Sequence, residues 1–155
     1  MYLMNNVNRL AKQFRNAIEL ARDNGDFNED FLFWRFPRGC CGDASELLAN
    51  FLLENNIRTS YVCGKYKPAA YENIQTHAWL ITDDQKIIDI TGDQFREKLE
   101  FLNYSEPIYI GEYDDFHKLF KFEDRDIREN NGLEALSSMV QFRLKMLYQK
   151  ISSYL

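Results

Sequence analysis

The sequence has few of the residues that are typical of disulfide-bonded extracellular proteins or of flexible linkers between domains. Its 155 residues include only three cysteines, three prolines, seven glycines and two histidines. An odd number of cysteines, two of them adjacent, is typical of a reducing compartment rather than of a disulfide-bonded scaffold. No segment is rich in proline, glycine or serine, and the chain is short for two comfortable domains. We therefore expect one domain that spans residues 1–155.

Long apolar runs and clusters of basic residues are also missing. No stretch approaches the roughly 18 consecutive apolar residues of a membrane-spanning helix. The segment Met1–Arg22 lacks the continuous apolar stretch and the small-residue cleavage site of a signal peptide. The formal net charge is −5, and no basic stripe is present to neutralise phosphates. We expect a cytoplasmic protein that binds neither membranes nor nucleic acid, and the sequence does not indicate its oligomeric state.

The residues that are present predict a well-packed core. Hydrophobic residues make up 45% of the chain and aromatic residues 15%, so little disorder is expected. Helical spacing of apolar residues occurs in the segments 7–21, 44–52 and 133–151, and strand-favouring residues occupy 58–63, 76–82, 86–91 and 107–110. The aromatic segment 31–36 is expected to be extended, and 114–120 to be a short helix or turn. Helices on either side of a central antiparallel sheet predict the α+β class.

Three short motifs indicate nucleophilic chemistry. They are Gly39-Cys40-Cys41-Gly42-Asp43-Ala44-Ser45, Thr76-His77-Ala78-Trp79 and Ile88-Asp89-Ile90-Thr91. In this order they place a thiol at an expected helix start, an imidazole on one strand and a carboxylate on the next. A Cys-His-Asp site needs these three groups, because a thiolate attacks, an imidazole moves the proton and a carboxylate orients the imidazole.

The second and third motifs are spaced as the two strands of a β-hairpin. If the turn is centred near Asp84, Thr82 pairs with Lys86, and His77 then lies within a residue or two of Asp89. Asp89 also stands among isoleucines, where an unpaired carboxylate would be costly to bury. The hairpin therefore predicts contact between the imidazole and the carboxylate.

The first motif is suited to activating a thiol. Unpaired amides at a helix start carry partial positive charge and lower the pKa of a nearby cysteine. Gly39 and Gly42 flank the two cysteines, so a substrate carbonyl could approach the backbone there, and the free amides, including that of Cys41, could stabilise an oxyanion. Each triad residue also has a structural interpretation, as a small buried thiol, a core histidine or a capping carboxylate.

Three further residues have both a functional and a structural interpretation. Gln94 could line the cleft or help to hold the oxyanion, or it could belong to a loop that Phe95 anchors to the core. Trp79 could border the substrate site and shelter the triad from water, or be a core aromatic residue. His117 could be a rival base, although its segment favours a surface helix.

A zinc site made by the cysteines is disfavoured. Cys40, Cys41, Cys63 and His77 supply four ligand types that zinc accepts. Adjacent cysteines rarely bind one tetrahedral ion, and the Cys-x-x-Cys spacing of structural sites is missing. We therefore expect no zinc site.

The motifs together resemble the transglutaminase-like branch of the papain-like cysteine protease superfamily. The segment from Gly39 is similar to its nucleophile helix, His77-Ala78-Trp79 to its His-Ala-Trp strand, and Asp89-Ile90-Thr91 to its Asp-Pro-Thr strand with isoleucine in place of proline. The resemblance covers roughly residues 37–95. It implies a core in which the nucleophile helix packs on a small antiparallel sheet, with flanking N- and C-terminal helices.

The resemblance also implies the function. It selects Cys41 over Cys40 as the nucleophile of a triad with His77 and Asp89, acting without a cofactor. Such a site would act on a peptide, protein or small amide through a thioester. Hydrolysis by a peptidase or amidase is the first expectation. The alternatives are acyl transfer or deamidation at protein glutamine with the same triad, and a non-catalytic binding module that keeps the fold.

Overall fold

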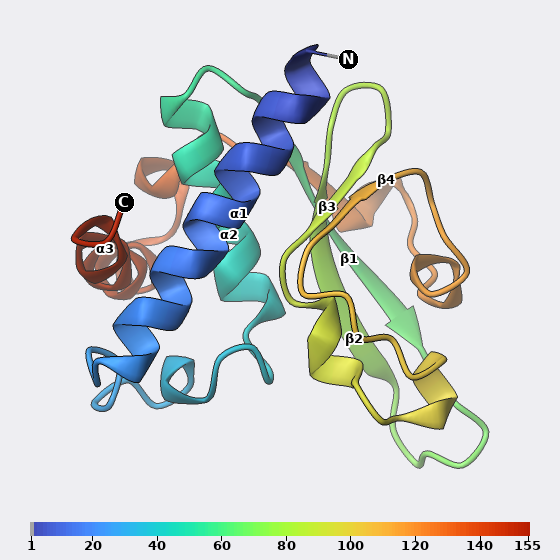
Figure 1. Cartoon of the computed structure of the whole chain (residues 1–155). Coiled ribbons are helices and arrows are strands. Elements are labelled where there is room, and N and C mark those ends of the chain that lie inside the picture. The colour runs from blue at the N-terminus through green and yellow to red at the C-terminus, as the bar shows by residue number, and fades with distance from the viewer. Residues whose placement is uncertain (1) are drawn as a thin grey trace.

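The computed structural model describes residues 2–155, in which three α-helices lie beside a five-stranded antiparallel sheet (Figure 1). The helices are α1 (Tyr2–Asp23), α2 (Cys41–Glu54) and α3 (Ser138–Ser152). The strands are β1 (Ser60–Tyr66), β2 (Gln75–Ile81), β3 (Ile87–Asp89), β4 (Tyr109–Gly111) and β5 (Ile127–Glu129), in the spatial order β4-β3-β2-β1-β5. The predicted α+β class is confirmed.

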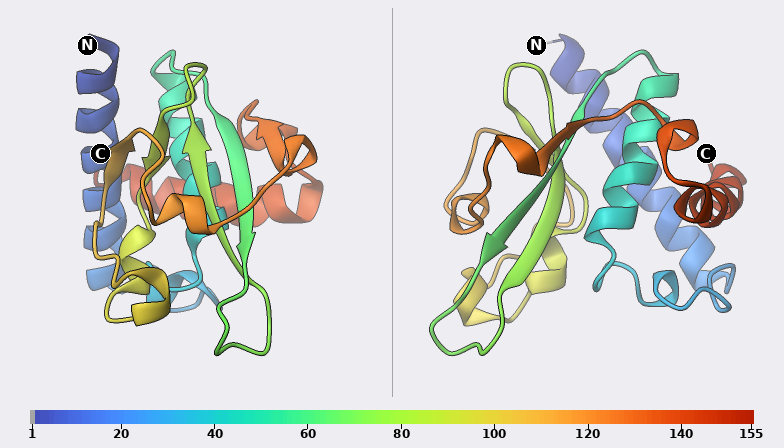
Figure 2. Two further views of the ribbon diagram at one scale, coloured as in Figure 1. Left: turned by 90° about the vertical axis from the view of Figure 1, so that its right-hand side faces the viewer. Right: turned by 180° about the vertical axis from the view of Figure 1, so that it is seen from behind.

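The helices gather on one face of the sheet, as the two rotated views show (Figure 2). Helix α2 contacts β1 and β2, and α1 and α3 pack against α2 and each other. Alternate residues of the sheet face opposite sides, as the pleat requires. Leu80 and Ile88 join the helical core, whereas Trp79, Ile81 and Ile87 join a second, aromatic-rich core on the other face.

The predicted hairpin forms between β2 and β3. Leu80 pairs with Ile88 and Ile81 with Ile87, and the Thr82 amide donates to the Lys86 carbonyl at 3.0 Å. This register places the carboxylate of the last residue of β3 on the same face of the sheet as the odd-numbered residues of β2. The aromatic core therefore surrounds the chemistry that the hairpin carries.

Arg15 of α1 fixes the chain where it leaves β3. Its guanidinium forms a two-bonded ion pair with Asp93, with both N–O distances 2.8 Å, and donates to the Ile90 carbonyl at 2.7 Å. The arginine side chain is only 7% exposed and the aspartate side chain 10%. A buried pair with these additional bonds holds the segment after β3 against α1.

Four sequence expectations differ from the structure. The aromatic segment 31–36 is not extended but coils into turns around a 3₁₀ helix at Phe33–Arg35, which lets Phe33 and Phe36 both enter the core. Helix α1 begins earlier than expected, at Tyr2. The last helix begins only at Ser138, after an extended Ser137 (φ −60°, ψ 152°), and Leu133–Ala135 forms a separate 3₁₀ turn. Strand β5 lies in a charged segment for which the sequence predicts no strand.

Candidate active site

Cys41 is the first residue of α2. Cys40 precedes it as the N-cap, and no side chain caps the helix start. The Ala44 amide donates to the Cys40 carbonyl at 2.8 Å, whereas the amides of Cys41, Gly42 and Asp43 have no hydrogen-bond partner among residues 2–155. These unpaired N–H groups carry the partial positive charge of the helix start and favour a thiolate there.

The pKa of the Cys41 thiol is shifted in the opposite direction from those of the Cys40 and Cys63 thiols. Burial favours its neutral form, but a hydrogen bond with His77, the charge of His77 and the Ala78 amide outweigh this and lower its pKa. Burial raises the pKa of Cys40 to about 12, and its thiol lies 3.3 Å from the Arg38 carbonyl. Burial also raises the pKa of Cys63. The electrostatics therefore favour Cys41 as the nucleophile.

His77 lies on β2, with its ring fully buried. Its Nε2 is 2.7 Å from Oδ2 of Asp89 at the end of β3, so Nδ1 is the ring nitrogen left for Cys41. Burial lowers the pKa of His77, but the charge and hydrogen bond of Asp89 outweigh burial and raise it. A cysteine with a lowered pKa beside a histidine with a raised pKa is the signature of a thiolate–imidazolium pair.

Asp89 holds more than one partner. Its Oδ1 accepts a hydrogen bond from the Thr91 amide at 2.9 Å, and its Oδ2 is also 2.8 Å from Nε2 of His117. Burial would raise the pKa of Asp89, but the charge of His77 and the hydrogen bond of His117 lower it instead. The carboxylate is thus kept ionised although its side chain is only 1% exposed.

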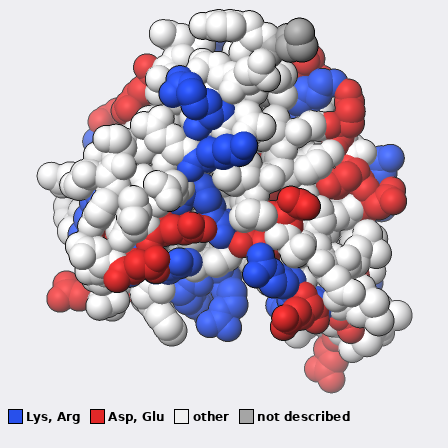
Figure 3. All heavy atoms as spheres, in the orientation of Figure 1, with Lys and Arg blue, Asp and Glu red and all other residues white. Residues whose placement is uncertain are grey.

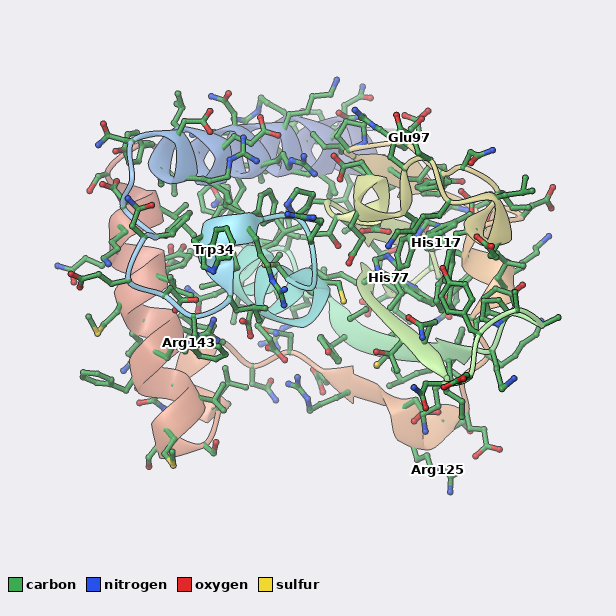
Figure 4. The ribbon with its side chains drawn as sticks, turned by 90° about the horizontal axis from the view of Figure 1, so that it is seen from below. Trp34, His77, Glu97, His117, Arg125 and Arg143 are labelled. Atoms are coloured by element: carbon green, nitrogen blue, oxygen red, sulfur yellow. The ribbon has the colours of Figure 1, made fainter. Side chains whose placement is uncertain are left out.

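His117 is the functional candidate that sequence reasoning placed wrongly. It was expected on a surface helix, but it is 0% exposed in a 3₁₀ helix, His117–Leu119. Its Nδ1 is 2.6 Å from Oδ1 of Asp114, so both ring nitrogens face carboxylates. Figure 4 shows His77 and His117 side by side, and their ring centroids are 6.1 Å apart.

Two ionised carboxylates around one imidazole require both ring nitrogens to carry hydrogen. Burial lowers the pKa of His117, but hydrogen bonds with Asp114 and Asp89 outweigh it and raise the pKa. The groups therefore alternate in charge from the Cys41 thiolate through His77, Asp89 and His117 to Asp114. The sequence signals were the Asp114-x-x-His117 spacing and the scarcity of histidine.

The four residues predicted to bind substrate lie in different settings. The Gln94 side chain accepts from the Gly39 amide at 3.1 Å, and its Nε2 is 3.5 Å from Nδ1 of His77. A Cβ atom on Gly42 would lie 3.2 Å from the hydroxyl oxygen of Tyr61. Trp79 is fully buried and donates to the Tyr113 hydroxyl at 3.2 Å, so its indole has no surface for a substrate and instead packs beside His77.

The same buried groups are the one metal-type cluster found within residues 2–155. The donor atoms of His77, Asp89 and His117 lie within 4.8 Å of one another. Both histidine nitrogens already contact the same oxygen of Asp89, at 2.7 and 2.8 Å. An ion bound there would displace both hydrogen bonds to Asp89, so the contacts present favour the triad arrangement.

Comparison with known proteins adds no relative. No family model matches the chain, and neither curated proteins nor solved structures give a significant match. Within residues 2–155, none of the helices combines the length and the apolar character needed to cross a bilayer.

Proposed function

We propose that the protein is a cysteine-dependent hydrolase of amide or related acyl bonds, with a transglutaminase-like core. The observation that supports this most is the lowered pKa of Cys41 beside the raised pKa of His77, which Asp89 holds at 2.7 Å. The imidazole and carboxylate are buried, whereas Cys41 is partly exposed at the surface end of the group. This arrangement keeps water from the proton-transfer groups, while the residue that carries the nucleophile retains some exposed surface.

The proposed reaction has two halves. The Cys41 thiolate attacks the acyl carbon, and the tetrahedral intermediate collapses as the His77 imidazolium gives its proton to the leaving amine. This leaves a thioester on Cys41 and a neutral His77. Water then loses a proton to His77 as it attacks the thioester, which releases the acid and restores the thiolate–imidazolium pair.

The oxyanion formed in each half would be stabilised at the start of α2. The Cys41 amide points out of the first helical turn without a partner, and Gln94 places its Nε2 near the imidazole. Amides fixed before the reaction stabilise developing negative charge without reorganisation. Removing one such donor costs about 100- to 1000-fold in rate in other enzymes.

Acyl transfer is the second candidate, because the same thioester can react with an amine. Nothing in the site itself selects water over an amine. A non-catalytic binding module is the third candidate, and the activated thiol disfavours it. The three free cysteines fit a reducing, cytoplasmic location.

The proposed function is tested with p-nitrophenyl acetate, an activated ester that needs no knowledge of the natural substrate. We expect a burst of about one nitrophenolate per chain, with the acetyl group found on Cys41 by peptide mass spectrometry. The burst is expected to be lost in Cys41→Ala and kept in Cys63→Ser, the matched control. Adding a primary amine then separates hydrolysis from transfer by the products formed.

The outcome that contradicts the proposal is equally clear. Slow nitrophenolate release without a burst, equal in the native chain and in Cys41→Ala, would show that no activated thiol is present. A burst that persists without Cys41 would assign the nucleophile elsewhere.

A further inference from the structure

A hollow of about 510 Å³ lies beside the start of α2. It is bounded by the loop that precedes α2, by the end of α1 and by the turn after β3. Its lining residues are Arg22, Trp34, Arg35, Phe36, Pro37, Arg38, Asp93, Gln94 and Arg96. Four of these nine are arginines, in a chain whose formal net charge is −5.

The positive charge of this hollow is not neutralised from within. Among residues 2–155, the side chains of Arg35, Arg38 and Arg96 form no ion pair with a carboxylate. The one acidic residue of the lining, Asp93, is bound through both of its oxygens to Arg15. Figure 3 shows basic side chains gathered at the lower centre of the face, over the loop that precedes α2.

Gln94 connects the hollow with the reacting groups. Gln94 lines it and also contacts the Gly39 amide at 3.1 Å and Nδ1 of His77 at 3.5 Å. Gly39 has a left-handed backbone (φ 68°), and a Cβ there would lie 3.2 Å from the guanidinium of Arg35. One arginine is therefore held against the residue two positions before Cys41.

An aromatic surface completes the hollow. Trp34 is 52% exposed although indole rings are usually well buried. Phe36, which also lines the hollow, is buried, with the guanidinium of Arg15 over its ring at 4.9 Å. An exposed indole beside unpaired guanidinium groups suits a ligand that has an apolar or planar part next to an anion.

We propose that this hollow binds an oxyanion group, a carboxylate or a phosphate, that the acyl substrate carries next to the bond attacked by Cys41. The inference rests on the proposed function and supplies its substrate class. Guanidinium groups bind both oxyanions through paired hydrogen bonds, which would place the scissile carbonyl at the start of α2. A neutral substrate of the same size would lack this positioning.

The test compares two alkylating reagents that differ in charge, iodoacetate and neutral iodoacetamide. The ratio of their rates at Cys41 in the folded chain is expected to exceed that ratio in the urea-unfolded chain by about tenfold. Each of Arg35→Ala, Arg38→Ala and Arg96→Ala is expected to lower the folded-state ratio by about 2- to 5-fold, the range of a single exposed ion pair. High salt is expected to lower it as well.

Arg125→Ala is the matched control, since Arg125 is an exposed arginine at a distant edge of the molecule from Trp34 (Figure 4). Its ratio is expected to equal that of the native chain. Equal ratios in the folded and unfolded chains, or an equal loss in Arg125→Ala, would overturn the oxyanion site. The absolute rate of Cys41 alkylation by iodoacetamide separately tests whether the thiol is activated. Failure of the oxyanion site is therefore distinguishable from failure of the proposed function.

Competition separates the two sources of the anion. Succinate and phenyl phosphate are added at equal ionic strength, and succinamide serves as the neutral comparison. Protection of Cys41 from iodoacetate by succinate alone indicates a carboxylate site, and protection by phenyl phosphate indicates a phosphate site. Protection no better than that by succinamide would contradict the inference.

Discussion

Replacing His77 by alanine is expected to slow the alkylation of Cys41 by iodoacetamide at pH 6 by about 10- to 100-fold. A cysteine with an ordinary pKa near 8.5 is less than about 1% thiolate at that pH, whereas a thiol paired with an imidazolium is largely ionised. The lower intrinsic nucleophilicity of a low-pKa thiolate reduces part of this gain. Because His77 is the largest favourable influence on the Cys41 pKa, its loss should remove most of the activation.

The dependence of the Cys41 alkylation rate on pH tests the same prediction. In the native chain the rate at Cys41 is expected to stay high below pH 7 and to fall only in more acidic solution. In His77→Ala it should instead rise with pH toward an ordinary cysteine midpoint. His77→Gln, which keeps polar bulk in the buried site, shows whether the alanine variant fails merely by unfolding. Equal profiles in all three folded chains would refute the thiolate–imidazolium pair.

Replacing His117 by alanine is expected to lower the free energy of unfolding by about 3–5 kcal/mol, the cost of breaking a buried ion pair from one side. The His117 side chain is 0% exposed and lies between Asp89 and Asp114, at 2.8 and 2.6 Å. Its removal leaves both carboxylates without their buried partner. Urea unfolding measures the loss, and Lys118→Ala, an exposed neighbour in the same 3₁₀ helix, is expected to cost little.

The pH dependence of stability distinguishes a charged His117 from a neutral one. Because its pKa is raised in the folded chain, its contribution is complete below the unfolded value near 6.5 and is lost as pH rises through the folded pKa. The stability difference between the native chain and His117→Gln is therefore expected to be largest near pH 6 and to shrink in alkaline solution. The pKa of Asp114 is lowered despite burial, by hydrogen bonds from His117, so its contribution is lost as pH falls through its folded pKa.

A difference that stays constant from pH 6 to 10 would show that His117 is neutral, with a single ring hydrogen to donate. Rescue by glutamine at every pH would lead to the same conclusion. Either result would leave His117 able to donate to Asp89 or to Asp114, but not to both at once.

The hairpin and the helix start could be predicted from sequence because local pattern determines them. Strand-favouring residues on both sides of a short turn set the register that brings His77 to Asp89, and the apolar spacing after Gly42 locates α2. The triad contacts follow once both elements are placed. Such features depend on neighbouring residues or on a repeating pattern, so a single sequence is enough to predict them.

The second histidine and the basic hollow could not be predicted in this way. His117 reaches Asp89 across 28 positions through a loop whose course depends on packing in the aromatic core. The arginines of the hollow form no basic run and come from three separate segments, so only the fold brings Arg35 and Arg96 to one surface. The sequence also could not show that Trp79 is buried and not exposed to substrate, because this depends on which segment covers its face of the sheet.

Thiolate absorbance near 240 nm, followed from pH 4 to 9 in the native chain and in Cys41→Ser, tests the central claim most directly. It reports the charge of the sulfur itself without a reagent or a substrate. We expect one thiolate, absent from Cys41→Ser and lost on mutation of His77, to persist below pH 7. If every thiol of the folded native chain titrates only above about pH 8.5, Cys41 is not paired with His77 and the proposed chemistry is contradicted.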